Sequence, residues 1–350
     1  MTKIFAPFKS ALIAVAAFGL LHGCASSGPV QENTKPVPTT VGALHPELTN
    51  YDYPFSVKFY EFESQGQKLK MAYADSAANA EKVNGRTVVL LHGKNFSAAY
   101  WVRTLRDLNA AGFRVIAPDQ IGFGKSSKPD YYQYSFQQLA LNTNNLLKSL
   151  GITRATFVGH SMGGMLAARY SLMFPESVEK LALVNPIGLE DWKLLAPYRS
   201  IDETYLAELK ATPESVKQYQ STAYFAGEWK PEYDSLIEVP VGWLKHADYR
   251  RIAWNSALTT DMVFTQPVVY EFPNIKAKTL LIIGQRDKTA IGKAWATPAN
   301  AAKMGDYPRL GRLTAKAIKG SKLVEILGAG HLPQVEKYEA YIKALVDFIR

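Results

Sequence analysis

One short segment, Gly159-His160-Ser161-Met162-Gly163 followed by Gly164, constrains this chain more than any other. It follows the apolar run 155–158, which is typical of a short buried strand. The residues after it have apolar side chains at helical spacing, at Met162, Leu166 and Tyr170. A serine on so sharp a turn has its hydroxyl pushed out of the sheet, and small neighbours let strand and helix pack closely. Ser161 is therefore either a nucleophile or, more simply, the cap of the helix.

A nucleophilic serine needs a histidine base, and two histidines, His246 and His331, follow Ser161 in the chain. His331 lies in a glycine-rich loop between a β-prone segment, 322–327, and a helix predicted over 334–349. His246 lies in a polar and aromatic segment without such a context. We predict that His331 is the base, and we keep His246 as the alternative.

The acid that orients the base is expected between the serine and the histidine. The apolar run 279–284 is typical of a strand buried on both faces, and Asp287 follows it after Gln285 and Arg286. Ligand chemistry collects at the carboxyl ends of such strands, which favours Asp287 over Asp261, a residue without a strand before it. The plainer interpretation of Asp287 is a helix cap or a salt bridge with Arg286.

Donors for a tetrahedral oxyanion are expected at two backbone amides. One is the N–H of Met162, directly after the serine. The other is the N–H of Lys94, in the loop after the predicted strand 86–91, with Asn95 as the next choice. His92, in the same loop, is expected to have a structural role. The Lys94 side chain either attracts a carboxylate-bearing substrate or points into solvent.

These motifs together resemble the α/β-hydrolase family over residues 55–350. The resemblance rests on Leu90-Leu91-His92-Gly93, the segment 118–126, the serine turn, 283–287 and Gly330-His331. It implies a catalytic triad of Ser161, Asp287 and His331. Many relatives carry arginine where this chain has Ile121, so a salt bridge made there is absent. The loop after 86–91 also lacks the triple-glycine run of some lipases and esterases.

The predicted fold class is α/β: a mostly parallel sheet of about eight strands, with helices on both faces and an inserted helical cap. The first part of the core covers 51–185, the cap 186–274 and the second part of the core 275–350. The cap segment is dense in aromatic residues, most of which are expected to form its own small core while some line an apolar pocket. The predicted strands are 55–63, 68–74, 86–91, 113–117, 155–159, 180–184, 278–284 and 322–327, and the predicted helices are 97–111, 135–150, 161–174 and 334–349.

The first 24 residues are predicted to be a signal peptide, because a basic start precedes an apolar stretch too short to span a bilayer. Cys24 is the only cysteine of the chain, so no intramolecular disulfide is possible. Small residues around it resemble a bacterial lipobox, which implies lipidation of Cys24, a membrane anchor and a location in the cell envelope facing the periplasm. The alternative is cleavage after Ala25 and release of a soluble protein. Residues 25–50 are predicted to be a flexible linker.

The formal net charge of +9 falls to +7 when Lys3 and Lys9 leave with the signal peptide. No basic and aromatic array of the nucleic-acid-binding type is present, and no metal or other cofactor is expected. We expect an enzyme that cleaves carboxylic esters of small to medium acyl or aromatic substrates. The same triad also serves carbon–carbon bond hydrolysis, amide or peptide cleavage and a perhydrolase side activity. A ligand-binding protein on this scaffold is the alternative outside enzymes.

Overall fold

The computed structural model of the protein describes residues 41–350. The predicted signal peptide, Cys24 and most of the predicted linker lie outside the described residues, and they remain predictions. Among residues 41–350, no helix is both long and apolar enough to cross a membrane.

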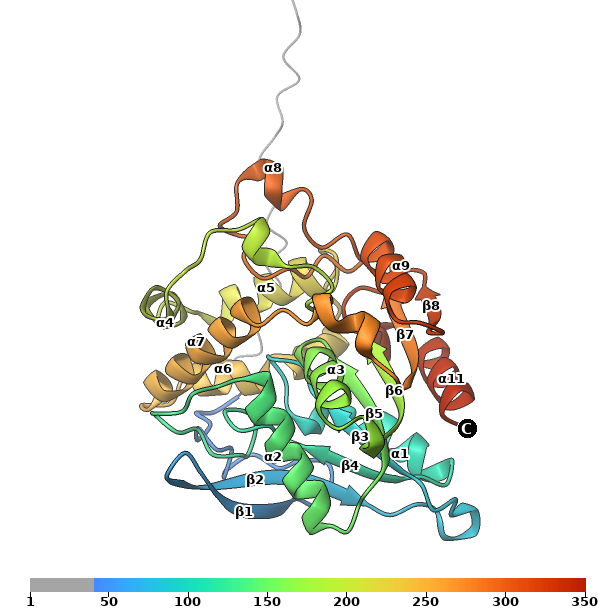
Figure 1. The fold of residues 1–350 in the computed structure, drawn as a ribbon. Helices are drawn as coiled ribbons and strands as arrows, with labels where there is room; N and C mark the ends of the chain where they lie inside the picture. The colour runs from blue at the N-terminus through green and yellow to red at the C-terminus, as the bar shows by residue number, and fades with distance from the viewer. Residues whose placement is uncertain (1–40) are drawn as a thin grey trace, which may run out of the picture. The chain divides into compact units, whose positions relative to one another are not determined.

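Eight strands form a single sheet in the order β1-β2-β4-β3-β5-β6-β7-β8 (Figure 1). The pairs β1–β2 and β2–β4 are antiparallel, and every other neighbouring pair is parallel. The predicted fold class is therefore confirmed. The strands are β1 (Lys58–Ser64), β2 (Gln67–Ser76), β3 (Thr87–Leu91), β4 (Arg114–Pro118), β5 (Ala155–His160), β6 (Val178–Val184), β7 (Lys278–Gly284) and β8 (Lys322–Ile326).

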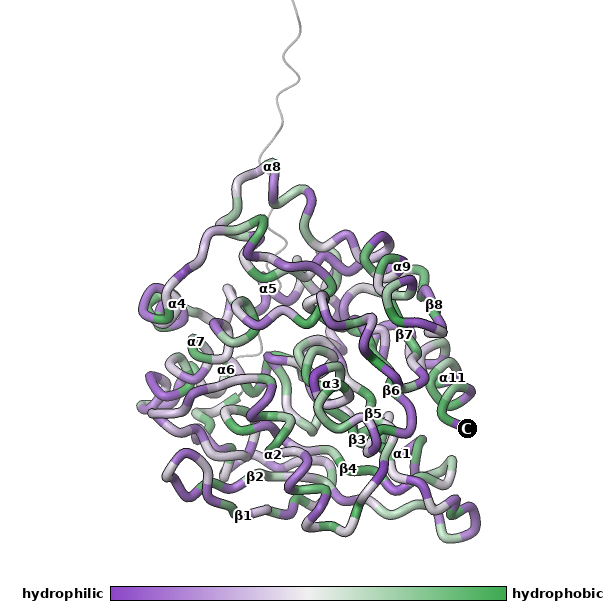
Figure 2. Tube along the Cα trace, viewed as in Figure 1, coloured by the Kyte–Doolittle hydropathy of each residue, from purple (hydrophilic) through white to green (hydrophobic). Residues whose placement is uncertain are grey.

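Helices cover both faces of the sheet because its central strands are apolar on both sides. On one face, α1 and α11 pack against the strands through residues such as Leu105, Leu108 and Tyr341. On the other face, α2, α3 and α9 pack through Leu139, Leu166 and others. Figure 2 shows mainly hydrophobic stretches where α3 lies against β5 and β6. These core helices are α1 (Val102–Ala110), α2 (Phe136–Ser149), α3 (Met162–Met173), α9 (Tyr307–Ala317), α10 (Pro333–Glu336) and α11 (Tyr338–Ile349), with the short 3₁₀ helices η1 (Ala80–Lys82), η2 (Ala98–Trp101) and η3 (Pro175–Ser177).

Two predicted helices are each divided in the structure. The helix predicted over 97–111 consists of η2 followed by α1, and the one predicted over 334–349 consists of α10 followed by α11. Lys337 has φ −137° and ψ 52°, outside the helical region, so α10 ends before it and α11 begins after it. The predicted strand boundaries differ from the observed ones by at most three residues.

The segment between β6 and β7 is mostly helical and lies beside the sheet (Figure 1). Part of its aromatic content packs on itself: Phe225, Tyr233 and Trp229 form a cluster with Phe96 from the core. Trp192 and Phe264 instead join the main core. Its helices are η4 (Trp192–Leu194), α4 (Ile201–Glu208), α5 (Pro213–Tyr224), η5 (Pro231–Leu236), α6 (Glu238–Leu244), α7 (Tyr249–Thr265) and η6 (Val269–Asn274), and a further short helix, α8 (Pro298–Ala301), follows β7.

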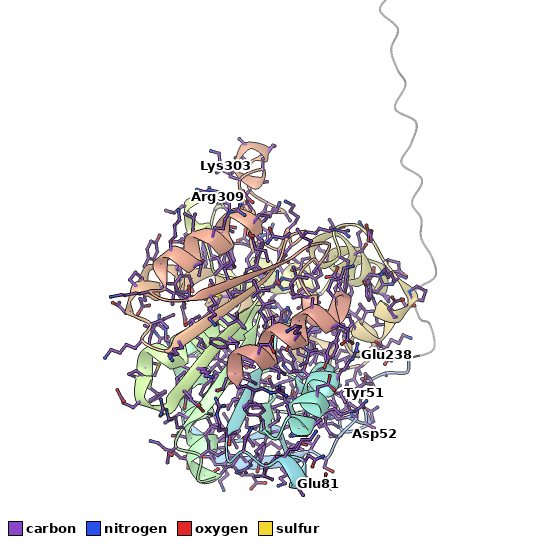
Figure 3. The ribbon with its side chains drawn as sticks, turned by 90° about the vertical axis from the view of Figure 1, so that its right-hand side faces the viewer. Tyr51, Asp52, Glu81, Glu238, Lys303 and Arg309 are labelled. Carbon is purple, nitrogen blue, oxygen red and sulfur yellow. The ribbon has the colours of Figure 1, made fainter. Side chains whose placement is uncertain are left out.

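The described end of the predicted linker is packed against this cap. Leu44 and Leu48 are buried, and the Leu44 N–H donates to the Gly242 carbonyl at 2.9 Å. Tyr51 donates its hydroxyl to Glu238 at 3.4 Å, and Figure 3 shows these two side chains near one another. Residues 44–50 are therefore part of the folded unit, in contrast to the linker predicted over 25–50, and Tyr51 lies in the predicted core.

Candidate active site

Ser161 stands on the turn between β5 and α3. Its backbone has φ 56° and ψ −122°, a strained conformation for a residue with a side chain, and its hydroxyl does not cap α3. A Cβ on Gly159 would lie 2.1 Å from the Gly163 carbonyl oxygen, and one on Gly163 would lie 2.2 Å from that of Leu91. Only glycine fits at both positions, so the turn is as tight as the sequence predicts. The alternative that Ser161 is merely a helix cap is not what the structure shows.

His331 and Asp287 form a buried pair. His331 Nδ1 lies 2.7 Å from Asp287 Oδ2, and both side chains are fully buried. Because the carboxylate accepts from Nδ1, the proton of the neutral ring is on Nδ1 and Nε2 has a free lone pair. Nε2 is buried and has no hydrogen-bond partner among the described residues. The ring is thus prepared to accept a proton at Nε2.

His331 is held next to the serine turn through the residue before Ser161. His160 Nε2 lies 2.8 Å from the carbonyl oxygen of His331, and the two rings are 4.8 Å apart. Burial, with the neighbouring His331 as a smaller contribution, lowers the pKa of His160 well below its ordinary value. The neutral His160 ring therefore donates from Nε2 and accepts at Nδ1 from the Tyr100 hydroxyl, 2.9 Å away.

Asn185, which the sequence reasoning missed, holds the Asp287 carboxylate in place. Its Nδ2 donates to Asp287 Oδ2 at 2.8 Å, and its Oδ1 accepts from the Gly284 N–H at 2.8 Å. Asp287 Oδ1 accepts from the Thr289 N–H at 2.8 Å. The sequence offered one signal for Asn185. It is a polar residue directly after β6, and β6 lies beside β7, the strand that precedes Asp287.

Two further residues, to which the sequence reasoning gave no role at the site, hold the loop of His331. The carbonyl oxygen of Tyr224, at the end of α5, accepts from the His331 N–H at 2.7 Å, and the two rings stack at 4.6 Å. Glu336 Oε1 accepts from the N–H of Gly330 at 2.8 Å and of Leu332 at 3.3 Å. Burial raises the pKa of Glu336 to about 7, although these two N–H groups oppose that shift. The loop of His331 is therefore fixed by one residue of the cap and one of the core.

The loop after β3 lies directly beside Ser161. A Cβ on Gly93 would lie 3.1 Å from Ser161 Cβ, so glycine allows this close approach. No described residue accepts a hydrogen bond from the backbone N–H of Lys94 or of Met162. His92 has a structural role, as expected: Nε2 accepts from the Gln120 N–H at 3.0 Å, and Nδ1 donates to the Gly93 carbonyl at 2.8 Å.

The alternative base and acid lie elsewhere. His246 Nδ1 accepts from the Asp248 N–H at 3.0 Å, and its ring contacts that of His45. Asp261, on α7, accepts from the Tyr198 hydroxyl at 2.9 Å. Neither is bonded to a residue of the serine turn, so the geometry favours His331 and Asp287.

A cavity of about 520 Å³ lies between the cap and the loop after β3. Ser161, Asp287 and His331 are not part of its wall, but Lys94 and Asn95 are, which places the cavity next to the serine turn. Of the cap aromatics, Tyr219, Trp243 and Tyr249 line it. Its wall also contains Ile291 and Trp295, from the loop after β7 and thus outside the predicted cap.

No group of three or more His, Cys, Asp and Glu side chains in the described part of the chain is arranged to hold a metal ion. A second cavity, of about 510 Å³, lies among residues that include Glu190, Lys303 and Arg309, and Figure 3 labels the two cationic side chains. No residue of the serine turn or of the His331 loop lines it.

Residues 86–338 match the family model described as the alpha/beta hydrolase fold, and the chain belongs to that family. A crystal structure of a probable hydrolytic enzyme from Pseudomonas aeruginosa PAO1 is similar over 89% of this chain and 99% of that one, with 50% identity and a TM-score of 0.86. Curated relatives match over shorter segments. A probable 1-acylglycerol-3-phosphate O-acyltransferase of Oryza sativa subsp. japonica is 33% identical over 38% of this chain, and the match covers 35% of that protein. A 2-hydroxy-6-oxononadienedioate/2-hydroxy-6-oxononatrienedioate hydrolase of Paraburkholderia phymatum is 38% identical over 37% of this chain, and the match covers 44% of that protein. The matched segment of the chain thus spans less than half the length of each of these two curated relatives.

Proposed function

We propose that the protein is a serine hydrolase that cleaves carboxylic esters through an acyl-enzyme intermediate. The observation that carries the proposal is the buried pair of His331 and Asp287, whose free Nε2 lies in a loop joined to the serine turn. Membership of the alpha/beta hydrolase fold family is consistent with it, but a fold by itself does not determine an activity.

In this mechanism Ser161 Oγ attacks the ester carbonyl while His331 Nε2 accepts its proton. Asp287 keeps the proton of the neutral ring on Nδ1 and stabilises the imidazolium that forms. The N–H groups of Met162 and Lys94 donate to the oxyanion. His331 then returns the proton to the leaving alcohol, and it activates water for hydrolysis of the acyl-enzyme.

The cavity supports substrates of small to medium size. Its volume of about 520 Å³ is in the range of cavities that hold drug-sized molecules. The cap residues Tyr219, Trp243 and Tyr249 supply aromatic surface for an acyl or aromatic group.

The test is hydrolysis of p-nitrophenyl esters of graded chain length by the protein, by Ser161→Ala and by Ser149→Ala. Ser149 is an exposed serine at the end of α2, so its variant is the matched control. We expect Ser161→Ala to lose at least about a thousandfold in kcat and Ser149→Ala to retain wild-type activity. A short-chain optimum is expected for the wild type.

Two results would contradict this proposal. Absence of ester hydrolysis by the folded wild type would move the interpretation to carbon–carbon or amide substrates, or to a binding protein. Equal activity in wild type and Ser161→Ala would remove Ser161 from the mechanism. If ligands bind both proteins equally and neither is turned over, the chain is a binder on this scaffold.

A further inference from the structure

The cavity wall contains an ammonium group in an unusual place. Lys94 is half-buried, and its side chain reaches from the loop after β3 to helix α7 of the cap, where Nζ donates to Ser256 Oγ at 2.8 Å. Ser256 Oγ in turn donates to Glu208 Oε1 at 2.9 Å. All three residues line the cavity of about 520 Å³. The sequence left open whether this side chain meets substrate or solvent, and the structure places it in the wall of the cavity.

The ammonium group is only partly satisfied by the protein. A lysine has three N–H donors, and Ser256 is the one acceptor that the described residues give to Lys94. No carboxylate lies within ion-pair distance of Lys94 in the described part of the chain, since Glu208 is reached only through the Ser256 hydroxyl. Burial lowers the pKa of Lys94, and the charge of Glu208 opposes that shift. An anion bound at Nζ would supply the missing acceptor and stabilise the charged form.

The charged residues around the cavity also favour binding of an anion. Its ionisable wall residues include the cations Lys94, Arg199 and Lys210 and the single carboxylate of Glu208. The Arg199 guanidinium lies over the Trp295 ring, 4.2 Å from its centre, so it is held at the wall. The wall therefore has an excess of positive charge, although most of its other residues are apolar.

We infer that Lys94, oriented by Ser256, binds a carboxylate carried by the substrate, so that the preferred esters are monoesters of dicarboxylic acids. The inference rests on the proposed ester hydrolysis. The same residue would contribute its backbone N–H to the oxyanion and its Nζ to the carboxylate. One lysine side chain then sets the separation between the ester carbonyl and the anion, which corresponds to a short acid such as glutarate.

The test compares two esters of the same size. One is the p-nitrophenyl monoester of glutarate, and the other is its neutral analogue, in which a methyl ketone replaces the free carboxylate. Background cleavage is subtracted with Ser161→Ala. In the wild type we expect kcat/KM to be about tenfold or more higher for the anion, as a charge-assisted hydrogen bond implies.

The informative quantity is the ratio of the two kcat/KM values in each variant. In Lys94→Met, which keeps the backbone N–H, we expect the ratio to fall to about one. In Ser256→Ala, which keeps the charge but not its orientation, the ratio is expected to lie between these values. Lys148→Met, which removes an exposed lysine of α2, should keep the wild-type ratio. If Lys94 only ties the loop to the cap, Lys94→Met lowers both rates equally and the ratio stays high, which overturns the inference.

A calorimetric titration with glutarate separates this inference from the proposed function. If the wild type prefers neither ester, the carboxylate site is wrong and the esterase proposal stands. If it cleaves neither ester, the esterase proposal fails, and the titration alone decides the site. Binding by wild type that Lys94→Met loses supports the carboxylate site, whereas absence of binding, or equal binding by both proteins, overturns it.

Discussion

Replacement of Asn185 by alanine tests the account of the active site most directly. Asn185 is fully buried and forms one hydrogen bond to the carboxylate of Asp287 and one to the N–H of Gly284. Asn185→Ala leaves the buried Gly284 N–H unpaired and removes one of the three hydrogen bonds to the buried Asp287 carboxylate. Together these losses cost about 3–5 kcal/mol of unfolding free energy. The backbone of Asn185 has φ 35°, a region that alanine tolerates less well than asparagine, and this adds to the cost.

The same change is expected to lower kcat. With Asn185 absent, Asp287 retains the Thr289 N–H and His331 as partners, so the carboxylate has lost one of its three constraints. A small displacement of the base costs about ten- to a hundredfold in rate. The assay is urea unfolding followed by fluorescence, combined with the p-nitrophenyl ester assay.

Asn144→Ala is the matched control for this prediction. Asn144 is buried and accepts from the Tyr170 hydroxyl at 3.1 Å, but its Nδ2 already has no partner among the described residues. Its loss is expected to cost about 1–2 kcal/mol and to leave kcat unchanged. If Asn185→Ala is as stable as Asn144→Ala and hydrolyses esters at the wild-type rate, Asn185 does not hold Asp287 in the way described.

Two further changes test the serine turn and the His331 loop. Gly159→Ala places a Cβ 2.1 Å from the Gly163 carbonyl oxygen. We therefore expect the unfolding free energy measured in urea to fall by about 1–3 kcal/mol and kcat to be lower. Gly42→Ala is the control, because a Cβ there has nothing within 4 Å, and it should change neither quantity. Equal stability of the two variants would contradict the tight packing of the turn. Because burial raises the pKa of Glu336 from 4.5 to about 7, the folded state binds its proton more tightly than the unfolded state does, and stability is lost as the pH rises through about 7. Between pH 4.5 and 8, the unfolding free energy of the wild type should therefore fall by on the order of 1–3 kcal/mol relative to that of Glu336→Gln, a range that allows for the partial exposure of Glu336. Parallel pH profiles of the two proteins would show that Glu336 does not titrate in this way.

The local features of the fold could be predicted from the sequence. Apolar runs of strand length, separated by segments of helical periodicity, specify a parallel sheet covered on both faces, and the strand boundaries differ by no more than three residues. The serine turn could also be predicted, because only a pair of glycines permits its close contacts. Asp287 and His331 could be chosen because each follows a strand, and the carboxyl ends of parallel strands lie at one edge of the sheet.

The partners of these residues could not be predicted in the same way. Asn185, Tyr224 and Glu336 contact Asp287 or the loop of His331 through hydrogen bonds that depend on where separate segments meet. A backbone carbonyl such as that of Tyr224 has no signature in the sequence. The break at Lys337 was missed for a related reason, since its apolar neighbours keep a helical period across a residue whose backbone is not helical.

The sequence by itself determined the sheet, the strand-to-helix turn of Ser161 and the placement of Asp287 and His331 after successive strands. These features depend on short-range periodicity and on the steric demands of glycine. The tertiary structure alone decided which groups surround them. It brought Ser256 and Glu208 of the cap to Lys94 of the core, three residues from separate segments that share one cavity wall. The physical reason is that hydrogen bonds between distant segments are fixed by packing of the whole domain, to which no local pattern of residues corresponds.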